Sequence, residues 1–336
     1  MRVSVIVITL NRPDYVSRCI RCLLAQTKLP HQIIVVDASV DDATAKLVAA
    51  DFPGVTYLRN DRGRGRMTTS RNLGLKHAAG EVIAFLDDDS FAEPQWLENL
   101  AATYAGDEIG AAGGRALNGQ PDEATRGVDE IGQIRANGLI TQNFAADPGR
   151  IVDVDIIIGC NMSFRRDVLA ALGGFREHYT GYSGSCEDTD ICLRVKKLGY
   201  KIRFNPAACV EHKGAPQFKG RRFDLRYELF GYRNYLMLLI VNYGFFSRFF
   251  WGAVAWLVLS AIQDFIRRVG GGFLLAFSRI AGGVAGCCLG CLLRLSLGAD
   301  PRRHDREGEE IRQSLEGGSV PSEPPIATVG SAAPLS

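Results

Sequence analysis

Three features that would point to particular protein classes are absent from this sequence. The 39 Lys and Arg residues nearly balance the 37 Asp and Glu residues, so the formal net charge is +2 and does not indicate nucleic-acid binding. The nine cysteines are odd in number and scattered through apolar segments, which fits a reducing compartment better than a disulfide framework. The apolar run at residues 3–10 lacks the cleavage site of a signal peptide. We interpret it as a strand, which places the N-terminal domain in the cytoplasm.

Half of a zinc-site pattern is present without its other half. Cys19 and Cys22 have C-x-x-C spacing, but they lie on an expected helix and no second pair follows. We interpret them as small helix residues. At 336 residues, the chain is long enough for one large domain or two small ones.

Strand and helix signals alternate along the first hundred residues. Short apolar runs rich in β-branched residues predict strands, and apolar residues at helical spacing predict helices between them. The expected strands cover residues 3–8, 32–36, 55–59 and 81–86, and the expected helices begin at Pro13 and cover 43–50, 69–79 and 94–104. This order predicts an α/β fold with a mostly parallel central sheet flanked by helices.

The pattern is less regular between residues 110 and 155, where glycine and polar residues dominate. We expect an irregular or mixed-sheet region there. Beyond it we expect short strands at 156–158, 201–205 and 208–211 and helices at 166–172 and 189–198.

The composition changes after residue 219. A helix is expected at 225–241, then two nearly apolar stretches at 245–262 and 270–297, the second containing Arg279 and Arg294. The first would form a helix of about 27 Å, at the lower limit for a membrane span.

Three arrangements of the two apolar stretches are open. Two spans would place Arg267 and Arg268 on the non-cytoplasmic side, against the positive-inside tendency. Two helices lying on the membrane surface avoid that conflict, and we expect membrane association. The alternative is a hydrophobic hairpin packed on the preceding domain or on a second subunit. The tail from residue 299 is expected to be disordered.

An acidic triplet follows the strand expected at 81–86. Asp87, Asp88 and Asp89 would lie at its carboxyl end, where open α/β sheets bind ligands. Hard oxygen ligands suit Mg²⁺ or Mn²⁺, and such a metal suits a diphosphate. The alternative is a solvated acidic turn.

Polar residues also end the other parallel strands. Thr9, Asn11 and Arg12 follow the first strand and Asp37 ends the second, so all should lie at one edge of the sheet. An arginine-bearing loop at 61–66 precedes the helix that carries Arg71 and Asn72. Positive charge ahead of a helix N-terminus suits a phosphate, although a solvated basic loop is the alternative.

A second acidic group opens the helix expected near residue 189. Asp190 fits a helix cap, whereas Glu187 and Asp188 lie earlier and could act as a general base. Gly159 and Asn161 belong to a preceding glycine-containing segment.

In combination, these segments resemble the family-2 glycosyltransferases, which have the GT-A fold. The resemblance covers about residues 1–215. It rests on the segments 3–12, 34–37, 71–74, 80–89 with Pro94, Trp96 and Leu97, 159–164 and 187–200. The resemblance implies a catalytic domain at 1–220, with a nucleotide-sugar half at 1–109 and an acceptor half at 110–220. Hydrophobic helices at 221–298 and the tail at 299–336 would follow.

The resemblance also implies a role for each matching residue. The donor would be held by Thr9, Asn11, Arg12, Asp37, Arg71, Asn72, Asp87 and Asp88. Asp89 and His212 would bind Mn²⁺ or Mg²⁺. Trp96, Gly159 and Asn161 would contact the acceptor. Asp188 would be the catalytic base, with Glu187 beside it.

The implied reaction moves a sugar from a UDP-, GDP- or dTDP-sugar to a saccharide or lipid-linked acceptor at the cytoplasmic face of a membrane. One base without a covalent nucleophile implies inversion. Ala38 departs from the second acid that relatives carry after Asp37, which leaves the nucleotide open. A metal-dependent nucleotidyltransferase and a non-catalytic sugar-nucleotide-binding scaffold are the alternatives. Oligomers could form through the C-terminal helices.

Overall fold

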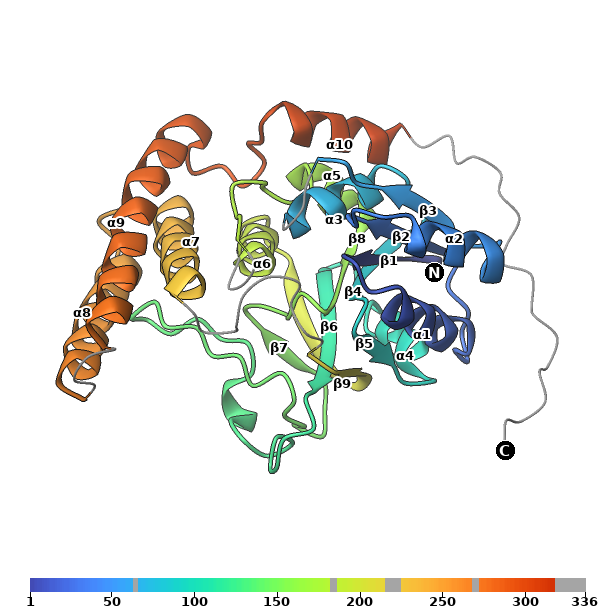
Figure 1. Cartoon of the computed structure of the whole chain (residues 1–336), viewed down its shortest axis with the longest axis horizontal. Coiled ribbons are helices and arrows are strands. Elements are labelled where there is room, and N and C mark those ends of the chain that lie inside the picture. Colours follow the sequence, from blue (N-terminus) through green and yellow to red (C-terminus); the bar gives the residue numbers. More distant parts are fainter. Residues whose placement is uncertain (63–65, 182–185, 215–224, 268–271, 318–336) are drawn as a thin grey trace.

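The computed structural model describes residues 1–62, 66–181, 186–214, 225–267 and 272–317, and its centre is a nine-stranded sheet (Figure 1). The strand order is β3-β2-β1-β4-β8-β6-β9-β5, with β7 paired to β9. The strands are β1 (Val3–Thr9), β2 (Gln32–Asp37), β3 (Thr56–Arg59), β4 (Val82–Asp87), β5 (Ser90–Ala92), β6 (Ile109–Leu117), β7 (Val152–Val154), β8 (Asn161–Arg165) and β9 (Lys201–His212).

The predicted parallel sheet is present in its N-terminal half. Strands β3, β2, β1 and β4 are parallel neighbours. Beyond them the sheet is mixed, because β8 runs antiparallel to β4 and β6, while β6 and β9 are parallel. The α/β prediction is therefore confirmed, and the mixed part combines β6 and β7 from the less regular region with β8 and β9 from beyond it.

Helices cover both faces of the sheet. Helices α1 (Pro13–Leu24), α2 (Ala43–Asp51) and α4 (Trp96–Ala102) pack on one face, where Val3, Val5 and Val7 of β1 point. Helices α3 (Met67–Leu75), α5 (Arg166–Leu172), α6 (Glu187–Lys197) and α10 (Arg306–Glu316) pack on the other, against Ile6 and Ile8. A short 3-10 helix, Val128–Glu130, lies in the irregular region.

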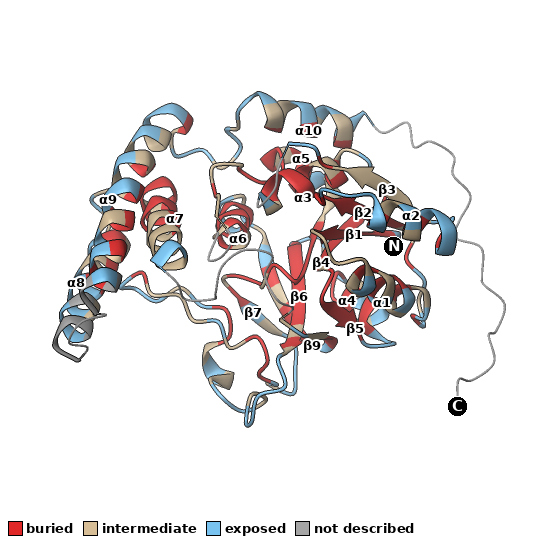
Figure 2. Cartoon of the chain, viewed as in Figure 1, coloured by how far each residue is buried: buried red, intermediate tan, exposed pale blue. Residues whose placement is uncertain are grey.

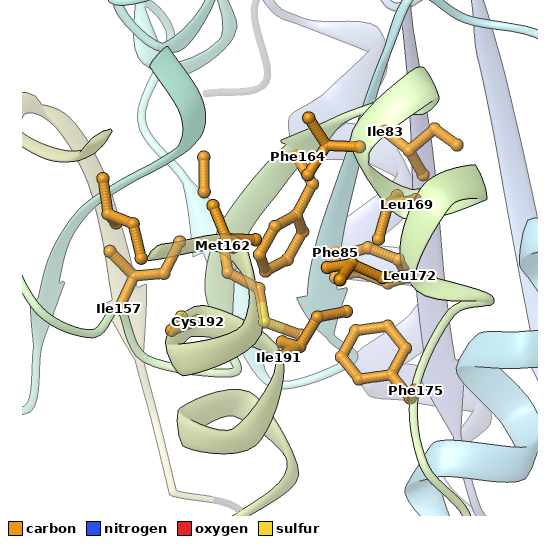
Figure 3. Packing of buried hydrophobic residues seen from close by; sticks show 14 of the residues in the cluster. Ile83, Phe85, Ile157, Met162, Phe164, Leu169, Leu172, Phe175, Ile191 and Cys192 are labelled. Atoms are coloured by element: carbon orange, nitrogen blue, oxygen red, sulfur yellow. The ribbon is translucent and has the colours of Figure 1, made fainter. Parts of the chain in front are cut away.

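The second face has an aromatic centre (Figure 3). Phe85 of β4, Phe164 of β8 and Phe175 pack edge to face, with ring centroids 5.2–6.3 Å apart. Ile191 of α6 packs into the same cluster. The helix that begins with Glu187 is thus fixed directly to the sheet.

Two local predictions are wrong. Residues 156–158 form no strand; Ile156 and Ile157 are buried core residues in an irregular segment, so burial rather than strand pairing explains their apolar pattern. Residues 201–205 and 208–211 are one continuous strand, β9.

The prediction of a disordered tail from residue 299 is wrong for α10. Asp305 caps this helix, Ile311 and Leu315 are buried in the core cluster, and Lys76, just after α3, pairs with Glu307. Two apolar residues four positions apart anchor this helix to the core, although the polar composition of the segment did not predict a helix. The prediction for 318–336 lies outside the described residues.

The C-terminal helices α7 (Leu225–Tyr243), α8 (Arg248–Arg267) and α9 (Gly272–Leu297) form a layer beside α6 (Figure 1). Three glycines one turn apart on α9 let it approach α7 closely: Gly282, Gly286 and Gly290. A Cβ atom at Gly286 would lie 2.3 Å from the carbonyl oxygen of Arg233.

Both arginines inside α9 face α7 rather than a membrane interior. Arg279 pairs with Glu228 at 2.7 Å, and Arg294 donates to the carbonyl oxygen of Val241 at 2.5 Å. Residues of the opposite side of α9 are exposed (Figure 2), including Phe277, Val284 and Leu295.

Candidate functional site

The polar ends of the parallel strands meet at one edge of the sheet, as predicted. Thr9 lies opposite Asp37 in the β1–β2 register, and Ile8 lies opposite Asp87 in the β1–β4 register. Strand β9 brings His212 to the same edge, because Ser90 pairs with His212 just after the acidic triplet.

Three of these side chains converge as metal ligands would. Each of Asp87, Asp89 and His212 offers one donor atom, and the three atoms lie within 4.8 Å of one another. His212 Nε2 lies 3.6 Å from a carboxylate oxygen of Asp89. Asp89 and His212 were predicted to bind metal, and the structure adds Asp87 to that group.

The hydrogen bonds of His212 suit a metal ligand. Its Nδ1 lies 3.1 Å from Asn118 Oδ1, an atom that can only accept, so the proton is assigned to Nδ1. In that tautomer Nε2, 3.6 Å from an oxygen of Asp89, is the nitrogen left to bind a metal. A cation would stabilise acceptors gathered in this way, and the contact between Nδ1 and Asn118 orients the imidazole ring. These residues therefore fit a divalent metal.

Asp88 has a different role from its neighbours. Its side chain is fully buried and accepts hydrogen bonds from Thr9 Oγ1 at 2.6 Å and Arg12 Nε at 3.0 Å. Burial raises the pKa of Asp88 to about 7, although Arg12 and Thr9 oppose that rise. These contacts join the ends of β1 and β4, so Thr9, Arg12 and Asp88 stabilise the sheet edge that carries the candidate metal ligands.

Asp37 is also enclosed by protein groups. It accepts hydrogen bonds from Tyr57 Oη at 2.8 Å and Arg59 Nη1 at 3.3 Å. Asn11 has a left-handed backbone with φ 56° and accepts a hydrogen bond from Val40 N. Within the basic loop, residues 63–65 lie outside the described residues, and Arg62 pairs with Glu307.

Arg71 connects the cluster of Asp87, Asp89 and His212 to the second acidic group. Its fully buried guanidinium donates to Glu187 Oε1 at 2.5 Å, Asp87 Oδ1 at 3.3 Å and the carbonyl oxygen of Gly159 at 3.3 Å. Burial alone would lower the pKa of Arg71, but Glu187 and Asp87 raise it overall. Arg71 thus stays charged between two carboxylates.

Asn72 lies next to Arg71 but turns away from it. Its amide accepts from Phe175 N at 2.9 Å and donates to Phe175 O at 2.8 Å. Both of these contacts are to backbone, which ties α3 to the segment ahead of α6. Asn72 does not line the cavity that Arg71 and Asp188 share.

Asp188 is oriented by backbone donors. Thr189 N donates to its Oδ1 at 2.6 Å and Gly159 N to its Oδ2 at 3.1 Å. Burial, and then the charge of Glu187, raises the pKa of Asp188 to about 6. Glu187 Oε2 is buried and has no hydrogen-bond partner among the described residues.

Asp190 is not the helix cap that was predicted. Its buried carboxylate accepts from Asn242 Nδ2 at 2.8 Å, Tyr179 Oη at 3.0 Å and Arg176 Nη1 at 3.3 Å. Burial opposes ionisation, but Arg176 and Arg194 lower the pKa of Asp190 below its usual range. Because Asn242 lies on α7, this cluster attaches the C-terminal helices to the helix of Asp188.

One cavity of about 640 Å³ contains the chemical groups. Six of the predicted site residues line it: Arg71, Asp87, Gly159, Glu187, Asp188 and His212. The predicted acceptor contacts Trp96 and Asn161 do not. Both are completely buried, and the indole N–H of Trp96 donates to Asn161 Oδ1 at 2.9 Å, so they form part of the core.

The sequence reasoning missed the far wall of this cavity. Four aromatic side chains from α7 and α8 line it: Tyr227, Tyr232, Tyr235 and Trp256. The tyrosines in residues 225–241 could have indicated a binding surface. Because that helix was expected to be membrane-associated, nothing in the sequence placed it beside Asp188.

Comparisons with known proteins agree with this geometry. The sequence model "Glycosyl transferase family 2" matches residues 4–173, and "N-terminal domain of galactosyltransferase" matches 142–214. The glucosyl-dolichyl phosphate glucuronosyltransferase of Haloferax volcanii is 30% identical over 223 residues, which are 63% of this chain and 69% of that protein. The pre-mycofactocin glycosyltransferase of Mycobacterium tuberculosis is 29% identical over 199 residues, 56% of this chain and 38% of that protein.

Solved structures show the same fold. GalNAc-T7 with UDP, GalNAc and Mn²⁺ aligns with a TM-score of 0.58 and 17% identity, over 84% of this chain and 55% of that one. S. aureus TarS 1–349 aligns with a TM-score of 0.54 and 15% identity, over 94% and 91%. Since the family model covers half of the sequence, the chain belongs to glycosyl transferase family 2.

Proposed function

We propose that this glycosyltransferase moves a sugar, with inversion, from a nucleotide-sugar donor to an acceptor hydroxyl in the synthesis of a cell-surface polysaccharide or glycolipid. The observation that carries the proposal is that Asp87, His212 and Asp188 line one cavity. The groups needed at the leaving diphosphate and at the attacking hydroxyl thus line the same space, with Arg71 between Asp87 and the Glu187–Asp188 pair. Family membership favours this reaction over nucleotidyl transfer.

The donor would bind at the sheet edge within residues 1–109. Asp87, Asp89 and His212 would hold Mn²⁺ or Mg²⁺, which would neutralise the departing nucleoside diphosphate. An imidazole ligand favours Mn²⁺, because Mg²⁺ prefers oxygen ligands. The presence of UDP and Mn²⁺ in the GalNAc-T7 structure supports this assignment. Burial raises the pKa of Asp87, and the guanidinium of Arg71, which also pairs with Glu187, opposes that rise.

Asp188 would accept the proton of the acceptor hydroxyl. Hydrogen bonds from Thr189 N and Gly159 N fix its carboxylate, and its raised pKa brings it closer to the pH at which a base works. Glu187 Oε2, which has no partner among the described residues, would accept a hydrogen bond from a neighbouring hydroxyl of the acceptor.

We further propose that α8 and α9 lie on the cytoplasmic surface of a membrane. Residues 276–297 form the one described helix long and apolar enough to cross a bilayer, with a mean hydropathy of 1.8. However, α9 packs along α7 through Gly282 and Gly286, and α7 is joined to α6 by Asn242. A surface position keeps these contacts and leaves Phe277 and Leu295 free to enter the lipid.

Two measurements test the function. A thermal-shift screen of nucleoside diphosphates and their sugars with Mn²⁺ identifies the donor, because a ligand that binds the folded state stabilises it. Release of nucleoside diphosphate from that donor then reports turnover. Stabilisation by no nucleotide, or release of pyrophosphate instead of a nucleoside diphosphate, would contradict the proposal.

A further inference from the structure

The cavity that holds Asp188 has two chemically different ends. The ends of β4, β9 and α6 supply charged groups at one end. The other end is walled by aromatic and aliphatic side chains from α7, α8 and the hairpin at residues 134–140, among them Tyr227, Tyr232, Tyr235, Trp256, Leu139 and Ile140. Most of this wall lies outside the segment matched to the family, which ends at residue 173.

The aromatic wall is rigidly held. The rings of Tyr232 and Trp256 stack with centroids 6.4 Å apart and planes 20° apart. The guanidinium of Arg279 lies 5.5 Å from the Tyr232 ring centroid. Tyr235 Oη donates to the carbonyl oxygen of Gly138 at 2.6 Å. Side chains fixed in this way lose little conformational freedom when a ligand binds.

Close backbone contacts join the hairpin to α8. A Cβ atom at Gly138 would lie 2.2 Å from the carbonyl oxygen of Phe249, and one at Gly252 would lie 2.5 Å from that of Asn137. Gly138 also has φ +81°, a conformation that favours glycine. Close packing of the hairpin against α8 therefore holds the aromatic wall in place.

The aromatic wall leads from the cavity to an apolar outer surface. Trp256 lines the cavity and is also 42% exposed. One turn further along α8, Leu259 is 59% exposed, and Ile262 is 50% exposed. An amphiphile could thus lie with its polar part beside Asp188 and its chain along α8.

We propose that this aromatic wall is the acceptor subsite and that the acceptor is a lipid-linked saccharide. Its sugar packs on Tyr232 and Tyr235 with a hydroxyl at Asp188, and its lipid passes Trp256 onto the outer face of α8. The buried, unpartnered Glu187 Oε2 supplies an acceptor for a second hydroxyl. This inference rests on the proposed function, because it assigns the acceptor of the same reaction.

Tryptophan fluorescence of the full chain tests the subsite directly. The sequence has three tryptophans, of which Trp96 is buried and Trp251 and Trp256 are both half-exposed on α8. The probe is dodecyl maltoside below its micelle concentration, with maltose as the control. In Trp251→Phe, which keeps Trp256, we expect a saturable blue shift with dodecyl maltoside and none with maltose. The matched variant Trp256→Phe should show no saturable shift.

Three results would overturn the subsite. Equal shifts in the two variants would mean that the alkyl chain only coats an apolar surface. An equal shift with maltose would mean that a soluble saccharide suffices. No shift in Trp251→Phe would mean that nothing binds at Trp256.

A second measurement places the probe beside Asp188. Bound dodecyl maltoside should reduce the release of free sugar from the nucleotide sugar at least fivefold, whether it displaces water or accepts the sugar itself. Saturable binding without this reduction would contradict the location. Failure of the wild-type chain to cleave any nucleotide sugar would count against the proposed function alone, since the fluorescence shift needs no turnover.

Discussion

Replacing Glu187 with Gln tests whether Asp188 is the base and whether the charge of Glu187 raises the pKa of Asp188. Burial and the charge of Glu187 raise the pKa of Asp188 to about 6. The substitution removes that charge. It also leaves Arg71 with Asp87 and Asp188 as its acidic neighbours, so both effects favour ionised Asp188.

The expected change is a shift of the acid limb of the pH–rate profile. A base must be ionised, so activity is present above the pKa of Asp188 and is lost as the pH falls through it. With a pKa of about 6, about a tenth of wild-type molecules carry ionised Asp188 at pH 5. Removing a neighbouring like charge should lower that pKa by about one unit, so the ratio of kcat at pH 5 to kcat at pH 8 rises about fivefold.

The assay is nucleoside diphosphate release at saturating donor, acceptor and Mn²⁺ between pH 4.5 and pH 8.5. A ratio of rates separates the pKa effect from any general loss through poorer acceptor orientation. Glu81→Gln, an exposed carboxylate away from the cavity, is the control and should leave the profile unchanged. Complete inactivity of E187Q at every pH would make Glu187 the base, and an unmoved acid limb would refute the coupling to Asp188.

The remaining predictions concern the metal, α6 and the α7–α9 contact. His212→Ala should raise the Mn²⁺ concentration for half-maximal activity at least tenfold, checked by metal titration; an unchanged titration would remove His212 from the ligand set. Asp190→Ala should destabilise the chain by about 3–5 kcal/mol in urea unfolding, because it leaves the buried Arg176 and Arg194 uncompensated; a loss below 1 kcal/mol would contradict this. Gly286→Ala should lower thermal stability, whereas Gly231→Ala, in a helix with open space around it, should raise it slightly; equal effects would refute the close contact.

The sheet-edge part of the candidate site could be predicted from the sequence because the ends of its strands can be recognised there. Apolar runs that stop at Asp37 and Asp87 place those residues at one sheet edge once the strands are parallel, and the registers agree. The Glu187–Asp188 pair was found for a similar reason, since the two carboxylates stand at the start of an expected helix, which the structure begins at Glu187.

The acceptor side could not be predicted in the same way. Trp96 and Asn161 satisfy each other inside the core, a pairing between residues far apart in sequence that no local pattern reveals. The cavity wall depends on α7 and α8 folding back over α6, which is fixed by the buried bond between Asn242 and Asp190. Hydrophobicity alone cannot distinguish such packing from a membrane helix.

Asp88 and α10 show the same limit. The triplet predicts a metal site, but only the positions of Thr9 and Arg12 show that Asp88 turns away from its two neighbours. The polar composition of 306–316 hides a helix that docks through Ile311 and Leu315.

The central claim is that Asp188 performs inverting sugar transfer beside a metal held by Asp87, Asp89 and His212. The most direct measurement follows the anomeric proton of the product by NMR in wild-type protein and Asp188→Asn, with the donor found by the thermal-shift screen and Mn²⁺. We expect the anomeric configuration to invert and the variant to lose about 10²–10⁴-fold in kcat while its affinity for the donor changes less than threefold. A retained configuration, or full activity of the variant, would contradict the account.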